Sequence, residues 1–354
     1  MRTAISTQST HSLRLRAGEW VKVRCKEEVF ASLDENGRLD ELPFMPEMLQ
    51  FCGKTFQVSS RAHKTCDPAI GVEGRKMANA VHLNLRCDGS AHDGCQARCL
   101  IFWKEAWLER VEDPVTESPK IPQDNVSDKN ARHIEEVLRS KVKASPAGDA
   151  TNAIYTCQNT QIKFATQTLK WWDLRQYVED YTSGNVSLWR LAAGLTYSIW
   201  RTLAEAGIGI GSPMRWIYDR YQRLVGGAPY PIRPFGVPKG VQTPKFQLDL
   251  KQGEPVRVKR FQEILNTLDH NYRNRGLYFD PEMVPFTEGV YEVDYRVGRI
   301  IDERTCKMVV FKSDAIVLKG VKCESRYAIC RRFCPRAIYP YWREIWLERT
   351  SQGD

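Results

Sequence analysis

The chain contains 354 residues and carries a formal net charge of +9; 42% of its residues are hydrophobic and 27% are charged. Its length allows two or three domains, each with its own core. The composition is typical of a soluble globular protein. No uncharged apolar run of about 18 residues occurs, which excludes a transmembrane helix. The mild basic excess indicates either a solvated surface or a binding face for an acidic partner.

Residues 1–17 are rich in serine, threonine and arginine. They lack the apolar run of about 7–15 residues that a secretory signal needs. We therefore predict a disordered tail and a cytoplasmic protein. In that case the eleven cysteines meet a reducing compartment, where clustered thiols bind metal more often than they form disulfides.

The chain contains an internal duplication. Residues 18–61 and 253–296 align without a gap at an offset of 235 and are identical at 17 of 44 positions. The copies also end alike, with WKEAWLERV at 103–111 and WREIWLERT at 342–350. Self-similarity of this kind identifies a repeated structural unit.

Each copy is predicted to be a small α+β unit. Residues 19–25 and 254–260 alternate between apolar and polar side chains, which predicts an opening strand. Residues 26–37 carry apolar side chains at helical spacing, which predicts a short helix. Further alternating segments lead to the tryptophan-rich ending. Several short strands of this kind predict two tandem antiparallel β-barrels of the Src-homology type, at 18–112 and 253–350.

The cysteines follow the duplication. A triplet spaced C-x7-C-x3-C in the first copy and C-x6-C-x3-C in the second lies before the shared ending. A fourth cysteine lies upstream on a predicted hairpin, whose tip can reach the triplet because neighbouring strands are about 5 Å apart. The predicted metal ligands are Cys66, Cys87, Cys95 and Cys99 in the first copy and Cys306, Cys323, Cys330 and Cys334 in the second.

Four thiolates suit zinc, which binds soft ligands tetrahedrally and stabilises the fold. An iron–sulfur cluster is the alternative cofactor; disulfide or redox chemistry and buried, unligated thiols stay open. Arginines near the second triplet would stabilise a metal–thiolate centre or activate a catalytic thiol. These candidate binding residues are Arg331, Arg332 and Arg336. His63 and His92 have no counterparts in the second copy, so we expect both to be bystanders.

Between the copies, residues 113–152 are predicted to be a linker with one short helix. Residues 153–225 form a Trp/Arg-rich helical segment, and residues 226–252 form a proline-rich tether. An apolar stripe and a narrow arginine stripe predict an amphipathic helix. Trp189 and Trp200 are candidate binding residues there, either packed against the copies or placed at an anionic membrane surface.

The stretches RCDGSAHDGCQ at 86–96 and FCPRAIYPYWREIWLER at 333–349 resemble those of a bacterial protein family with duplicated cysteine-containing domains. The resemblance covers most of the chain from Gly18 onward. It implies a bacterial setting linked to biosynthesis, but no activity that could be transferred.

These observations favour a non-catalytic, metal-stabilised binding or scaffold protein with two four-thiolate sites, accessory to a bacterial biosynthetic pathway. Its expected partner is another protein, with peripheral membrane contact through the central helices. One alternative is an iron–sulfur oxidoreductase or electron-transfer accessory. Another is a nucleic-acid-binding module that uses the basic surface, whose affinity would fall steeply with salt.

Overall fold

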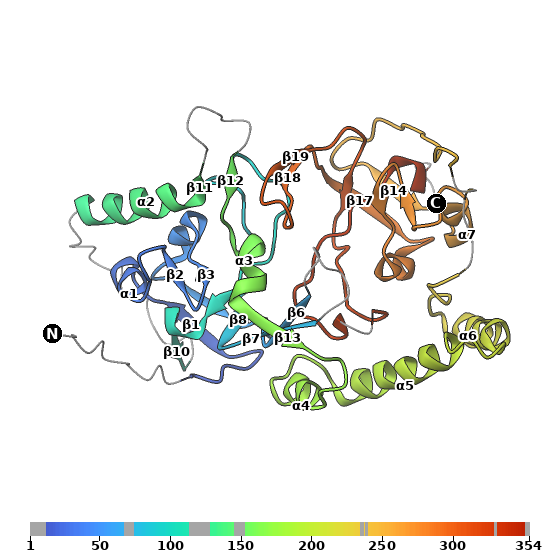
Figure 1. Cartoon of the computed structure of the whole chain (residues 1–354), viewed down its shortest axis with the longest axis horizontal. Helices are drawn as coiled ribbons and strands as arrows, with labels where there is room; N and C mark the ends of the chain where they lie inside the picture. Colours follow the sequence, from blue (N-terminus) through green and yellow to red (C-terminus); the bar gives the residue numbers. More distant parts are fainter. Residues whose placement is uncertain are drawn as a thin grey trace.

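The computed structural model describes residues 12–66, 74–112, 128–144, 153–233, 237, 240–328 and 331–350. The chain is a mixed helix-and-strand protein, in agreement with the predicted α+β class. The first copy, in blue, and the second copy, in orange, lie side by side, and the helices of residues 175–225 run along one edge of the molecule (Figure 1).

The helices and strands are short. The helices are α1 (Lys26–Ala31), α2 (Asp128–Val142), α3 (Gln158–Ala165), α4 (Arg175–Thr182), α5 (Leu188–Ala204), α6 (Gly211–Val225) and α7 (Phe261–Leu265). The strands of the first copy are β1 (Trp20–Val23), β2 (Arg38–Leu39), β3 (Leu42–Pro43), β4 (Thr55–Gln57), β5 (Ser60–Arg61), β6 (Lys64–Cys66), β7 (Gly74–Met77), β8 (Ala80–His82), β9 (Trp103–Lys104) and β10 (Leu108–Val111). The central segment adds β11 (Lys143–Ala144), β12 (Ile154–Tyr155) and β13 (Thr166–Leu169). The second copy contains β14 (Pro255–Val258), β15 (Arg273–Asn274), β16 (Leu277–Tyr278), β17 (Val290–Arg296), β18 (Arg299–Ile301), β19 (Met308–Val310), β20 (Ile316–Leu318) and β21 (Leu347–Arg349).

The strands pair antiparallel in small sheets. The first copy contains the three-stranded sheets β10-β1-β4 and β5-β8-β9, whereas the second contains the four-stranded sheet β20-β17-β14-β21; both copies also contain two-stranded sheets, β2-β3 in the first and β15-β16 and β18-β19 in the second. No closed barrel forms among the described residues. The predicted Src-homology-like barrels are therefore not found there. Most strands have only two to four residues, too few to curl a sheet until its edges meet.

The duplication is repeated in the packing of the two cores. Phe44 lies edge-on to both tryptophans of the first ending, with ring centroids 6.2 and 5.1 Å apart. Its counterpart Phe279 does the same in the second copy, at 6.1 and 5.2 Å. The buried tryptophans are Trp103 and Trp107 in one copy and Trp342 and Trp346 in the other. Shared sequence positions therefore build the same aromatic core twice.

A buried glutamate anchors the segment that precedes each copy. Glu105 accepts hydrogen bonds from the backbone N–H groups of Arg14 and Leu15, and it forms a 2.7 Å ion pair with Arg61. Leu15 is fully buried. Residues 12–17 are therefore packed, and their assignment to a disordered tail was wrong. Residues 1–11 of the predicted tail lie outside the described residues.

The central segment is joined to the first copy. The predicted linker helix is present as α2. Strand β13 pairs with β7 and extends the β6–β7 hairpin to three strands. At the start of α3, the side chain of Gln158 accepts a hydrogen bond from the Phe102 backbone N–H and donates one to the Phe102 carbonyl. Among the described residues, no helix has both the length and the apolar character needed to cross a bilayer.

Helix α5 approaches the second copy most closely at Gly194. A Cβ atom at this position would lie 2.3 Å from Cζ of Phe333. We therefore expect Gly194→Ala to destabilise the protein by about 1–3 kcal/mol through overpacking, although alanine normally stabilises a helix relative to glycine. Urea unfolding would measure the change, and Phe333→Leu in the same chain should recover part of it. A gain in stability from Gly194→Ala would contradict the close approach.

Candidate metal centres

The first cysteine triplet lines a small cavity together with a fourth thiol from the central segment. Cys87, Cys95, Cys99 and Cys157 all line this cavity, which has a volume of about 30 Å³. Cys157 is the residue immediately before α3. The structure therefore places Cys157 beside the first triplet, in the position for which we predicted Cys66.

A tight loop presents the triplet. The Cys87 backbone N–H donates to the Cys99 carbonyl at 2.9 Å, which closes the base of the loop. At its tip, Gly89 adopts a positive φ of 73°, and a Cβ atom there would lie 2.1 Å from the Cys95 carbonyl oxygen. Only glycine fits that position. The backbone thus brings Cys87, Cys95 and Cys99 to one side of the first copy.

A second kind of donor group lies beside the first triplet. It consists of Glu47, Cys87 and His92, whose ligand atoms all lie within 4.8 Å of one another. Among the described residues, no other group of three or more candidate ligands is this compact. His92 Nδ1 lies 2.6 Å from Glu47 Oε1, and Nε2 lies 3.1 Å from the Thr156 carbonyl oxygen. Because a carboxylate and a carbonyl only accept hydrogen bonds, both ring nitrogens donate. Burial alone would lower the pKa of His92, but Glu47 outweighs it and raises that pKa. A doubly protonated imidazole cannot bind a metal ion.

The counterpart of Glu47 in the second copy supports a structural role for this group. Glu282 accepts hydrogen bonds from the backbone N–H groups of residues 326–328 in the loop that follows Cys323. Glu47 likewise accepts one from Ala91. In both copies, a buried glutamate holds the loop of the triplet. His92 supplements this anchor in the first copy, and this arrangement leaves no ring nitrogen of His92 free to bind a metal ion.

The second thiol cluster contains residues of both copies. Cys66, at the end of β6, is hydrogen-bonded to Cys334, and both side chains are buried. The thiol of Cys323 lies close enough to interact electrostatically with Cys334. The hydrogen bond from Cys334 lowers the pKa of Cys66 to about 6 and raises that of Cys334. Cys330, the middle cysteine of the second triplet, lies outside the described residues.

The two hairpins are exchanged between the copies. The β6–β7 hairpin places Cys66 against the second triplet. In return, the β18–β19 hairpin lies over the first triplet, where the Ile301 backbone N–H lies 3.4 Å from the Cys95 sulfur. At its tip, the Cys306 carbonyl accepts a hydrogen bond from the backbone N–H of Tyr155 in β12. Cys306 therefore lies beside the central segment, not in the second cluster for which we predicted it. Figure 1 shows both hairpins between the two copies.

The predicted arginines have different surroundings. Arg336 is buried between the two clusters; its guanidinium donates to the Cys66 carbonyl and to Glu303, both at 2.9 Å. Arg331 pairs with Asp280. The Arg332 guanidinium lies 5.2 Å from the ring centre of Tyr197. Arg336 and Arg331 lie near the thiols, and the positive charge of each lowers the pKa of Cys66.

The predicted tryptophans differ in exposure. Trp189 is 83% exposed on α5, whereas Trp200 is half-buried against the aromatic cluster that joins α5 to the second copy. Trp189 is available to a partner, and Trp200 holds the helix in place.

Burial favours the neutral form of four other thiols in the clusters. Burial raises the pKa of Cys87 and Cys99, and it raises the pKa of Cys157 and of Cys323 to about 12. Deprotonation of these buried thiols needs a compensating positive charge, which a bound cation supplies.

Comparison with protein-family models and with curated proteins gives no match for this chain. The geometry and chemistry of the thiol clusters are therefore the only guide to its function.

Proposed function

We propose that the chain is a non-catalytic, metal-stabilised binding protein in which two zinc ions hold the two copies and the central segment in a fixed arrangement. The first ion would be bound by Cys87, Cys95, Cys99 and Cys157. The second would be bound by Cys66, Cys323 and Cys334, with Cys330 as the fourth ligand. The observation that carries the proposal is that four thiols from two separate segments line one small cavity.

The chemistry of the donors fits zinc. Both sets consist of thiols, which are soft ligands typical of closed, structural zinc sites. No three described cysteine sulfurs lie within 4.8 Å of one another, whereas sulfurs in a tetrahedral zinc site are about 3.8 Å apart. Zinc binding would therefore draw the thiols inward and close the cavity. The buried Arg336 beside Cys66 would offset the net negative charge of a four-thiolate centre.

The exchange of hairpins indicates what such ions would accomplish. A zinc ion at Cys66 and Cys334 would bond the first copy directly to the second. An ion at Cys157 would bond the central segment to the first copy. Metal binding would thus fix the two copies and the central segment relative to one another. A rigid protein of this kind suits a binding or scaffold role.

Metal analysis of the full chain, purified without oxygen, tests the proposal. We expect about two zinc ions per chain and a colourless protein. Detection of iron, together with absorbance at roughly 400 nm, would indicate an iron–sulfur centre instead of zinc and would overturn the proposal. If the protein contained no stoichiometric metal, both the zinc sites and the iron–sulfur alternative would be rejected.

A further inference from the structure

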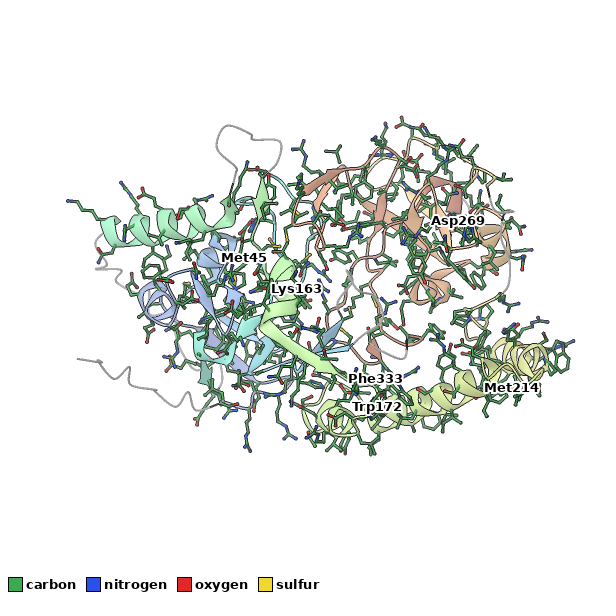
Figure 2. All side chains as sticks on the ribbon, viewed as in Figure 1. Met45, Lys163, Trp172, Met214, Asp269 and Phe333 are labelled. Atoms are coloured by element: carbon green, nitrogen blue, oxygen red, sulfur yellow. The ribbon has the colours of Figure 1, made fainter. Side chains whose placement is uncertain are left out.

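The segment from Trp171 to Val225, which contains α4–α6, exposes an unusual amount of apolar surface. Of the 24 large hydrophobic side chains that are exposed among the described residues, 16 lie in this segment. We call it the helical edge. Its most exposed members include Trp172, Trp189, Ile199, Trp216 and Leu224. Figure 2 shows Trp172 and Met214 of α6 along this one edge of the molecule.

The polarity of α5 is reversed relative to an ordinary surface helix. Trp189, Ile199 and Leu203 point away from the protein and are 83%, 65% and 45% exposed. The intervening exposed positions of this face are alanines and threonines. A surface helix normally turns its apolar stripe inward and its charges outward.

The charged residues of α5 are directed toward the second copy. Arg190 donates to the Glu324 carbonyl at 3.0 Å, and Arg201 donates to the Tyr327 carbonyl at 2.7 Å. The buried face of α5 also contributes Tyr197 to an aromatic cluster with Tyr327. The inner face of α5 therefore packs against the second copy, whereas its apolar outer face is exposed.

The charge of the helical edge is positive on the outside. Each of its five carboxylates pairs with a basic side chain, and three of these partners come from outside the edge. The pairs are Asp173–Arg175, Glu179–Arg61, Asp180–Lys64, Glu205–Arg201 and Asp219–Arg233. Arg220 and Arg223 are exposed on α6, and the Arg220 guanidinium lies 5.2 Å from the ring centre of the exposed Trp216.

We infer that the helical edge docks onto the surface of an anionic lipid bilayer. An interfacial helix combines an apolar face that enters the acyl boundary with arginines and tryptophans at the level of the headgroups. Here α5 provides the uncharged apolar face, and α6 provides arginine beside tryptophan. Anionic headgroups complement the outward arginines, and the acyl region accepts Ile199 and Leu203. This inference is independent of the proposed metal sites.

Vesicle flotation of the full chain tests the docking. We expect binding to vesicles of phosphatidylcholine mixed with phosphatidylglycerol and much weaker binding to phosphatidylcholine alone. Arg220→Gln with Arg223→Gln should lower the partition coefficient on mixed vesicles by about 30-fold. Ile199→Glu with Leu203→Glu should abolish binding. These side chains are exposed, and circular dichroism would verify that the variants fold.

The matched control replaces two exposed apolar side chains elsewhere, with Val241→Glu and Phe246→Glu on the tether; this variant should bind like the unmodified chain. Failure of the unmodified chain to bind mixed vesicles would overturn the inference, as would undiminished binding of the Ile199→Glu/Leu203→Glu variant. Light scattering that shows a dimer broken by the same two substitutions, without vesicle binding, would assign the edge to a second copy of the chain. Zinc content is measured in a separate experiment, so failure of the metal proposal can be distinguished from failure of membrane docking.

Discussion

Replacement of Cys157 by serine is expected to reduce the zinc content from two ions per chain to one. Structural zinc contributes about 10–16 kcal/mol in small zinc modules, so we expect the unfolding free energy to fall by more than about 4 kcal/mol, beyond the range of ordinary substitutions. Elemental analysis and thermal unfolding, with and without a chelator, measure the two effects. The chelator should destabilise the unmodified chain far more than the variant.

Three further serine substitutions distinguish the proposed ligand sets from the predicted ones. Cys66→Ser should remove the second ion. Cys306→Ser should retain both ions, because its described contact is made by the main chain. Cys25→Ser, at an exposed cysteine, is the control and should change stability by about 0.5 kcal/mol or less. Loss of zinc from Cys306→Ser but not from Cys66→Ser would contradict the exchange of hairpins.

Glu344→Gln is expected to destabilise the second copy by about 1–3 kcal/mol, because a neutral amide cannot accept all the hydrogen bonds that the buried carboxylate accepts. Glu344 is fully buried. It accepts hydrogen bonds from the backbone N–H groups of residues 248–250 and forms a 2.5 Å ion pair with Arg296. Urea unfolding at neutral pH measures the loss. Glu348→Gln, which removes an exposed carboxylate on β21, should cost less than about 1 kcal/mol.

The same carboxylate makes stability dependent on pH. Burial alone would raise the pKa of Glu344, but the hydrogen bonds from Arg296 and the backbone outweigh it and hold that pKa below its ordinary value of 4.5. A lowered pKa contributes stability above the unfolded value, and this contribution is lost as pH falls through the folded value. The unmodified chain should therefore weaken below about pH 4.5, and the Glu344→Gln chain should show a shallower loss. Equal slopes in both proteins would contradict this origin.

The duplication and the first elements of each copy were predictable because they depend on patterns along the chain. Phe44 and Phe279 occupy equivalent positions in the aligned segments, and each packs on the tryptophans of the shared ending. The strands at 20–23 and 255–258 and the helix at 26–31 likewise occur where the periodicity of the side chains indicated. The barrels did not form because side-chain alternation indicates a strand but not whether its sheet closes.

The partners of the cysteines were less predictable. Spacing grouped Cys66 with the first triplet and Cys306 with the second, because alignment places equivalent residues in equivalent units. Each copy contributes one such hairpin, and each hairpin lies against the cysteine triplet of the other copy. Cys157 has no counterpart in the duplication, so the spacing of the cysteines could not identify it as a candidate ligand.

From the amino-acid sequence alone, the repeated unit and the cysteine triplet of each copy could be inferred, because both are patterns visible along the chain. Only the tertiary structure decided which thiols meet and which face of α5 remains outside. Both outcomes depend on how one copy packs against the other, and that packing is the sum of many weak contacts between residues about 200 positions apart, such as the hydrogen bond from Gly298 to Gln96.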